Sequence, residues 1–157
     1  GIRLGELLAL TIGDFDFENQ MVRINKSYQR IDGRDVITDP KTKKSIRTVT
    51  MPDFICDEMQ RYFSGFYKPK KDDRIFLITK GYLHREMRRG CAETGVKKIR
   101  IHDLRHSHVS LLIDIGLPAL AIADRVGHES IDITYRYAHL FPSKQTEIAE
   151  KLNMERE

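Results

Sequence analysis

The stretch HDLRHSHVSLLIDIG, residues 102–116, contains the pattern that decides the fold of this 157-residue chain. It predicts one helix, which a glycine brings to an end. His102 and Arg105 are three residues apart and therefore lie on one face of that helix. His106 and His108 follow within the same two turns. One short helix thus gathers a guanidinium and three imidazoles, side chains that can bind anions and move protons.

Further helices and a small sheet are predicted around this stretch. Gly95 and Gly127 each follow an apolar-periodic segment, as glycines at helix C-termini do. An Asp-Gly pair at residues 32–33 predicts a β-hairpin. The predicted helices cover residues 1–10, 53–67, 80–94, 103–115, 118–126, 131–137 and a tail at 143–157, and the predicted strands cover 20–28, 35–39, 46–51 and 75–78. This order predicts an α+β fold, mostly α-helical, with a small antiparallel three-stranded sheet.

The positive charge of the chain is concentrated in two segments. The formal net charge is only +4. Residues 20–50 and residues 80–108 each hold eight basic and three acidic side chains, while both ends of the chain are acidic. Two separate cationic segments favour a surface for a polyanion such as DNA, although they are also compatible with two solvated faces.

Composition excludes several other classes of protein. Hydrophobic residues make up 40% of the chain and charged residues 32%, which argues against wholesale disorder. No apolar run approaches the roughly 20 residues that a membrane-spanning helix needs. Cys56 and Cys91 have no metal-binding or redox spacing, so free thiols in a reducing compartment are expected. The length suits one domain, and the chain opens inside a predicted helix, which suggests the C-terminal part of a larger protein.

The candidate chemistry is that of phosphodiester transfer. Guanidinium groups match the oxygens of a phosphate and stay charged, whereas imidazoles move protons near neutrality. A tyrosine hydroxyl can act as the nucleophile and store the bond as a covalent ester, and a lysine can protonate the leaving oxygen. The residues that could supply these parts are Arg3, Lys41, His102, Arg105, His128 and Tyr137.

Each of these residues also has an ordinary structural interpretation. Lone histidines are more often surface or satisfied core residues than ligands. His102 and His106 are four residues apart, but no HExxH pattern or cysteine pair supports a zinc site. Tyr135 and Tyr137 could be core aromatics, and the lysine-rich loop could protect an exposed sheet edge.

The order of these residues resembles the catalytic domain of the tyrosine recombinases, the phage integrase family. GIRLGELLAL is similar to the family's first arginine box, and DPKTKKSIRTVTMP to its lysine-bearing hairpin. HDLRHSHVSLL resembles the His-x-x-Arg box, and VGHESIDITYRYAHL resembles the final box. The overall pattern is most like integrases of Gram-positive phages and integrative elements.

The resemblance implies roles for the catalytic candidates. Arg3 and Arg105 would clamp the scissile phosphate, and Tyr137 would attack it and leave a 3′-phosphotyrosyl link. Lys41, favoured over two neighbouring lysines, would protonate the leaving 5′ oxygen. His102 would assist proton transfer around the tyrosine, and His128 would hydrogen-bond the phosphate. No metal or other cofactor is implied. His106 and His108 are matched to no catalytic role and are expected to pack or to bind backbone.

The resemblance also implies the partners. The chain would be the catalytic domain of a site-specific DNA recombinase, acting on double-stranded DNA in the bacterial cytoplasm as a homotetramer. The tail at 143–157 would either exchange between protomers or pack on its own domain. A type IB topoisomerase-like enzyme and a catalytically silent DNA-binding relative are the alternatives. The expected phosphate contacts are Lys43, Lys44, Arg47, Arg85, Arg88, Arg89, Lys97, Lys98 and Arg100.

Overall fold

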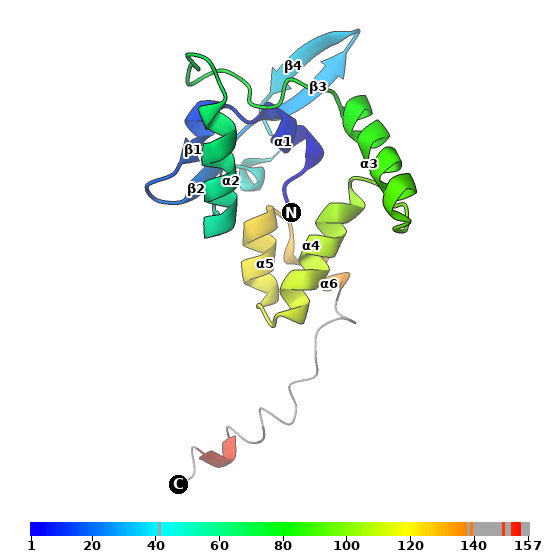
Figure 1. The fold of residues 1–157 in the computed structure, drawn as a ribbon. Coiled ribbons are helices and arrows are strands. Elements are labelled where there is room, and N and C mark those ends of the chain that lie inside the picture. The colour runs from blue at the N-terminus through cyan, green and yellow to red at the C-terminus, as the bar shows by residue number, and fades with distance from the viewer. Residues whose placement is uncertain (41, 138, 140–148, 150–151, 155–157) are drawn as a thin grey trace.

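The fold combines α-helices with two small antiparallel sheets (Figure 1). It was obtained as a computed structural model, and the structure describes residues 1–40, 42–137, 139, 149 and 152–154. The helices are α1 (Leu4–Ala9), α2 (Asp53–Ser64), α3 (Lys80–Thr94), α4 (Asp103–Asp114), α5 (Ala119–Val126) and α6 (Ile131–Tyr135), with short 3₁₀ turns at Ile12–Asp14 and Lys43–Ser45. All six helices agree with helices predicted from the sequence. The tail helix predicted at 143–157 lies largely outside the described residues.

A three-stranded antiparallel sheet is present, as predicted, but its membership differs: residues 15–16, not predicted as a strand, form one of its strands, and the predicted strand at 35–39 belongs to a separate hairpin. The three-stranded sheet is formed by β1 (Phe15–Asp16), β2 (Met21–Ile24) and β5 (Arg47–Thr50), with β2 in the centre. A separate hairpin of β3 (Ser27–Ile31) and β4 (Arg34–Thr38) adds a second, two-stranded sheet. Its turn is at the predicted Asp-Gly pair, where both residues have positive φ angles of 49° and 76°. Such a turn matches the twist of the two strands.

Two strand predictions need correction. The strand predicted over residues 20–28 is divided, because the chain leaves one sheet after Ile24 and enters the other at Ser27. Residues 75–78 form no regular strand; an isolated bridge joins Arg74 to Thr11 instead. Their apolar side chains are explained by packing, since the segment contributes to a hydrophobic cluster next to α1.

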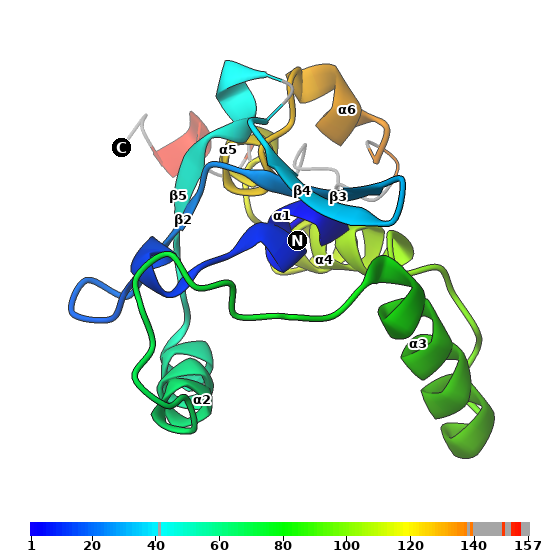
Figure 2. The ribbon, with the colours of Figure 1, turned by 90° about the horizontal axis from the view of Figure 1, so that it is seen from above.

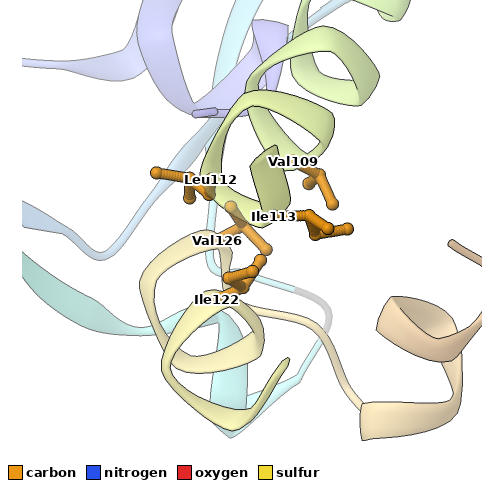
Figure 3. Close-up of a cluster of buried hydrophobic side chains, with 5 residues drawn as sticks. All are labelled: Val109, Leu112, Ile113, Ile122 and Val126. Carbon is orange, nitrogen blue, oxygen red and sulfur yellow. The ribbon is translucent and has the colours of Figure 1, made fainter. Parts of the chain in front are cut away.

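Two hydrophobic clusters hold the elements in place. The first joins α4 to α5 through Val109, Leu112, Ile113, Ile122 and Val126 (Figure 3). The second joins α1 to β3, where Leu8, Ala9 and Tyr28 are buried and Phe76, Ile78 and Leu83 pack against them. Burying these side chains contributes roughly 1.5–3 kcal/mol for each large aliphatic residue. The start of α1 is joined to the C-terminal half by hydrogen bonds, from Arg3 to the carbonyl of Gly127 and from Arg105 to the carbonyl of Gly1.

The long helix α3 stands apart from the centre of the fold. Figure 2 shows α2 and α3 well separated, with α1 and α4 between them. The Thr79 hydroxyl caps the N-terminus of α3, and Gly95, at φ 72°, ends it. None of the described helices combines the length and the apolarity that crossing a bilayer requires.

Candidate active site

Arg3 is positioned by the helix that it precedes. Its backbone N–H donates to Glu6 Oε2 at 2.9 Å, and its Nη1 donates to Glu6 Oε1 at 2.8 Å. The carboxylate therefore receives both the capping contact of α1 and an ion pair from the same residue. Arg3 Nη2 donates to the carbonyl of Gly127 at 2.8 Å, so the guanidinium also reaches the end of α5.

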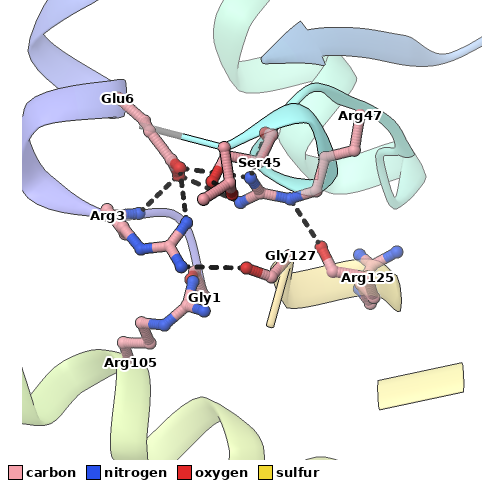
Figure 4. A network of polar contacts seen from close by, with 9 residues as sticks. Gly1, Arg3, Glu6, Ser45, Arg47, Arg105, Arg125 and Gly127 are labelled. Atoms are coloured by element: carbon pink, nitrogen blue, oxygen red, sulfur yellow. Dashed lines mark hydrogen bonds and ion pairs between the residues drawn. The ribbon is translucent and has the colours of Figure 1, made fainter. Parts of the chain in front are cut away.

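Arg47, at the start of β5, holds Glu6 from the other side (Figure 4). Its Nη1 and Nη2 donate to the two carboxylate oxygens at 3.2 and 3.0 Å. Its Nε donates to the carbonyl of Arg125 at 3.0 Å. The side chain is only 7% exposed, so Arg47 joins the sheet to α1 and α5 inside the protein. This position does not offer its guanidinium to the DNA backbone, the role expected from the sequence.

Gly127 brings the end of α5 into this network. The N–H groups of Gly127 and His128 donate to the carbonyls of Asp124 and Ala123, which is the Schellman pattern of helix termination. Gly127 has a φ of 66°, the left-handed conformation that this pattern requires. A Cβ at this position would lie 2.8 Å from Nη1 of Arg47. Glycine is therefore required both by the backbone and by the close approach of Arg47.

Arg105 is buried in α4 and only partly satisfied. Its side chain is 6% exposed, and Nη1 donates to the carbonyl of Gly1 at 2.5 Å. Nη2 is buried and has no hydrogen-bond partner among the described residues. An unsatisfied buried donor costs about 1–3 kcal/mol or more when charged, so such a group commonly awaits a ligand.

The site carries an excess of positive charge. Burial and the nearby charges of Arg3 and Arg47 lower the pKa of Arg105 to about 10. Burial opposes ionisation of Glu6, but the hydrogen bonds from Arg47 and Arg3 outweigh it and lower its pKa. Arg3 and Arg47 bind the one carboxylate of Glu6, and the charge of Arg105 adds to theirs without a carboxylate contact of its own. The remaining positive charge favours binding of an anion.

His128 follows the glycine and is neutral near pH 7. Its Nδ1 is hydrogen-bonded to Oγ1 of buried Thr134 at 2.8 Å, which fixes the ring between α5 and α6. Burial lowers the pKa of His128 to about 4, assisted by the charges of Arg105 and Arg3. A neutral imidazole beside an anion site can donate a hydrogen bond through its other nitrogen.

Tyr137, immediately after α6, points toward α4. It is half-buried, packs against the cluster between α4 and α5, and its hydroxyl is hydrogen-bonded to Nδ1 of His106. Burial raises its pKa, although the charges of Arg105 and Arg136 act in the opposite direction. Tyr135 is 52% exposed and faces no such partner in the described part of the chain. The structure thus places Tyr137, rather than Tyr135, beside the arginine cluster.

His102 lies at the N-terminus of α4, next to these groups. Its ring meets that of His106 edge-to-face, with 4.9 Å between the ring centroids. Burial and the charge of His106 lower its pKa. Within the described residues, no hydrogen bond joins His102 to Tyr137; His106 makes that contact instead. His106 packs against the ring of His102, as expected, but it also hydrogen-bonds the Tyr137 hydroxyl, which the sequence did not predict. In the sequence, only the position of His106 directly after Arg105 could have indicated this contact.

The lysine-rich loop can be followed only in part. Lys41 lies outside the described residues, and the side chain of Lys43 is likewise not described. Lys44 is exposed, and its Nζ donates to the carbonyl of Glu129 at 3.0 Å. This contact brings the loop next to the segment that carries His128.

The other expected DNA contacts lie on or near α3. Arg85 stacks over the ring of Tyr82, Arg89 is paired with Glu86 and Glu93, and Arg100 is paired with Asp103. The remaining ones, Arg88, Lys97 and Lys98, are exposed. In the described part of the chain, no group of three or more His, Cys, Asp or Glu side chains is arranged to hold a metal ion.

A match to a protein-family model identifies the family of this chain. The model described as "Phage integrase family" matches residues 1–144. The chain belongs to the phage integrase family. The match covers most of the residues that form the site, from Arg3 through Tyr137, and confirms the resemblance drawn from the sequence.

Individual integrases and recombinases are similar over nearly the whole chain. The ICEBs1 integrase of Bacillus subtilis is 36% identical over 98% of this chain and 45% of its own length. A XerC-like tyrosine recombinase of Caldanaerobacter subterraneus is 28% identical over 98% of this chain and 46% of its own. The chain therefore spans less than half the length of these phage integrase relatives.

Solved structures confirm the predicted fold. The Tn1549 transposon integrase in complex with transposon right end DNA superposes with a TM-score of 0.73, at 24% identity, over 98% of this chain and 54% of that one. The catalytic domain of bacteriophage HP1 integrase gives a TM-score of 0.62, at 24% identity, over 96% and 74% of the two chains. The chain therefore has the fold of phage integrase catalytic domains.

Proposed function

We propose that this chain is the catalytic domain of a site-specific DNA recombinase that cleaves and rejoins strands through a 3′-phosphotyrosyl intermediate. The family membership supports a strand-transfer enzyme of this class. The similar Tn1549 transposon integrase was solved in complex with DNA, which supports DNA as the partner.

The single observation that carries the proposal is the unsatisfied guanidinium of Arg105. Its buried Nη2 has no protein partner in the described chain and lies in a cluster whose charge is not balanced by the one carboxylate. A phosphate oxygen satisfies both the hydrogen bond and the charge. Tyr137, which packs against α4 and is hydrogen-bonded to the residue after Arg105, is then the nucleophile at that phosphate.

The remaining groups support the same reaction. Arg3 is anchored by Glu6 and Gly127 through two of its five N–H groups, which leaves others for a phosphate oxygen. Neutral His128 donates a further hydrogen bond. Lys41 protonates the leaving 5′ oxygen, as the sequence resemblance implies. The Tyr137 ester conserves the energy of the broken bond, so that a 5′-hydroxyl of a partner strand can reverse the step.

The cationic residues of the lysine loop and of α3 provide the phosphate contacts that set register on duplex DNA. We further propose that the working assembly is a homotetramer on paired recombination sites, in the bacterial cytoplasm. Residues 143–157 would carry contacts between protomers. Truncation after residue 142 is expected to weaken synapsis measured by gel-shift, and an unchanged complex would favour a tail that packs on its own domain.

A nicked suicide substrate tests the chemistry. The wild-type chain is expected to form a covalent protein–DNA complex, which Tyr137→Phe abolishes and the matched control Tyr135→Phe retains. A wild-type chain that binds DNA without covalent trapping would leave only the silent DNA-binding alternative. Strand exchange between two sites then separates a recombinase from a relaxation enzyme of the type IB class.

A further inference from the structure

The hydroxyl of Tyr137 has one hydrogen-bonding side chain in the described structure, and that side chain is His106. The bond joins Tyr137 Oη to His106 Nδ1, between the segment after α6 and the first turns of α4. The two rings lie with their centroids 6.0 Å apart and are tilted by 42°. His106 is otherwise exposed.

The position of His106 in α4 couples it to the anion site. It follows Arg105 directly, and its ring packs against that of His102 on the preceding turn. The charged and titratable groups around it are His102, Asp103 and Arg105 on its own helix, with His128 and Tyr137 from the opposite side. The nucleophile is therefore held by the residue next to the arginine that would bind the target phosphate.

We propose that His106, rather than His102, accepts the proton of the Tyr137 hydroxyl during strand cleavage. This inference rests on the proposed function and names a group for one of its steps. This step requires the tautomer in which Nδ1 holds the lone pair and Nε2 carries the hydrogen, so that the Tyr137 hydroxyl donates to Nδ1.

Cleavage exchanges the P–O5′ bond for a bond between phosphorus and Tyr137. The Tyr137 Oη–P bond forms while the P–O5′ bond breaks, and the phenolic proton passes to His106 Nδ1. The departing 5′ oxygen takes a proton from an ammonium group, for which Lys41 is the candidate. In rejoining, the 5′-hydroxyl attacks the phosphorus and gives its proton back to the neutral amine, for which Lys41 is the candidate. The P–O5′ bond forms as the phosphotyrosyl bond breaks, and the His106 imidazolium returns its proton to Tyr137. No oxidant, reductant or metal is involved in this exchange.

The contact itself is testable without DNA. Imidazole nitrogen NMR of the wild-type chain is expected to show His106 Nδ1 as an unprotonated acceptor. Tyr137→Phe should shift that resonance, whereas Tyr135→Phe should not. A His106 Nδ1 resonance that is the same in wild type and Tyr137→Phe would overturn the inference.

The proton-transfer role is tested by single-turnover cleavage of a suicide substrate. His106→Ala is expected to lower the cleavage rate by about 10²- to 10⁴-fold, the usual contribution of a general base. His106→Asn retains a hydrogen-bonding group but cannot take a proton, so it should be as slow as His106→Ala. Ser107→Ala, which removes an exposed hydroxyl from the next position of α4, is the matched control and should keep the wild-type rate.

Two further readouts separate a proton acceptor from a merely positioning residue. The wild-type cleavage rate should decline toward acid pH, because a general base must be unprotonated to accept a proton, and the His106 variants should lose that decline. A fluorinated tyrosine at position 137, whose hydroxyl is more acidic, should reduce the defect of His106→Ala by about tenfold or more. Full activity of His106→Asn, or no rescue by the fluorinated tyrosine, would overturn the role of His106.

Different experimental results would contradict the proposed function and the role of His106. A wild-type chain that forms no covalent complex would contradict the function, and the role of His106 with it. Normal trapping at Tyr137 together with an unchanged rate for His106→Ala would contradict the His106 assignment alone.

Discussion

Arg47 places two guanidinium nitrogens on the two carboxylate oxygens of Glu6, at 3.2 and 3.0 Å, although 41 residues separate them in the chain. The pair is nearly inaccessible, with side chains 7% and 4% exposed. Arg3 donates to the same carboxylate. Glu6 is therefore the shared anchor of an arginine that faces the site and an arginine that ties the sheet to it.

Removing the carboxylate of Glu6 should destabilise the folded chain. Glu6→Gln leaves two guanidinium groups without their counter-charge, and the free energy of unfolding is expected to fall by about 3–5 kcal/mol. Urea denaturation at pH 7 measures this. Glu86→Gln removes an acceptor from the exposed Arg89 pair and should cost far less, because solvent and salt screen an exposed ion pair. Equal losses in the two variants would contradict the anchor role of Glu6.

The glycines that end α5 and α3, Gly127 and Gly95, form a matched pair for substitution. Gly127→Ala adds backbone strain at φ 66° and brings a methyl group to 2.8 Å from the Arg47 guanidinium. Gly95→Ala adds similar strain at φ 72°, but nothing lies within 4 Å of the new methyl group. We expect Gly127→Ala to lower the thermal midpoint more than Gly95→Ala, and to impair covalent trapping as well. Identical thermal shifts would show that the approach of Arg47 carries no cost.

The planar guanidinium of Arg105 should contribute more to phosphate binding than its positive charge alone. Arg105→Lys keeps a cation in α4 but cannot supply two parallel donors from one planar group. The yield of covalent complex with a suicide substrate is expected to fall by about 10²-fold or more, as for loss of a single transition-state donor. Circular dichroism should confirm that α4 is intact. Wild-type trapping by Arg105→Lys would argue against bidentate phosphate binding.

His128 should make the folded state sensitive to acid. Its pKa is about 4 in the folded chain, against about 6.5 for an unperturbed histidine, because burial and nearby arginines disfavour the imidazolium. The unfolded chain therefore binds more protons between these values, and stability falls as the pH drops from about 6.5 toward about 4. Denaturant unfolding at several pH values should show a smaller fall for His128→Gln. The exposed His84→Gln should behave like wild type.

Two neighbouring arginines of α3 should differ in their contribution to DNA binding. Arg88 is exposed, and no acidic partner contacts it in the described chain, whereas Arg89 is paired with Glu86 and Glu93. Arg88→Ala is expected to reduce the slope of log affinity against log salt by about 0.9, the value for one phosphate contact. Arg89→Ala should change it less. Fluorescence anisotropy across a salt titration measures both, and a flat salt response in wild type would contradict electrostatic binding altogether.

The order of the catalytic candidates could be predicted from the sequence because each motif spans only a few neighbouring residues. The glycines after α3 and α5, the Asp-Gly hairpin turn and the helix around Arg105 follow from propensities acting over a few residues. The same holds for the resemblance to the phage integrase family, which depends on spacing along the chain. These features need no knowledge of which segments meet in space.

The sequence determined the helices, the family and the series Arg3, His102, Arg105, His128 and Tyr137. The tertiary structure alone decided that Arg47 is buried against Glu6, that Arg105 keeps an unsatisfied donor, and that His106 holds the Tyr137 hydroxyl. The physical reason is that two of these facts are contacts between residues 31 or more apart in the chain. The third is the lack of any partner for a buried donor. Local propensity cannot specify such contacts; they follow from the way the buried clusters of α1, α4 and α5 bring the segments together.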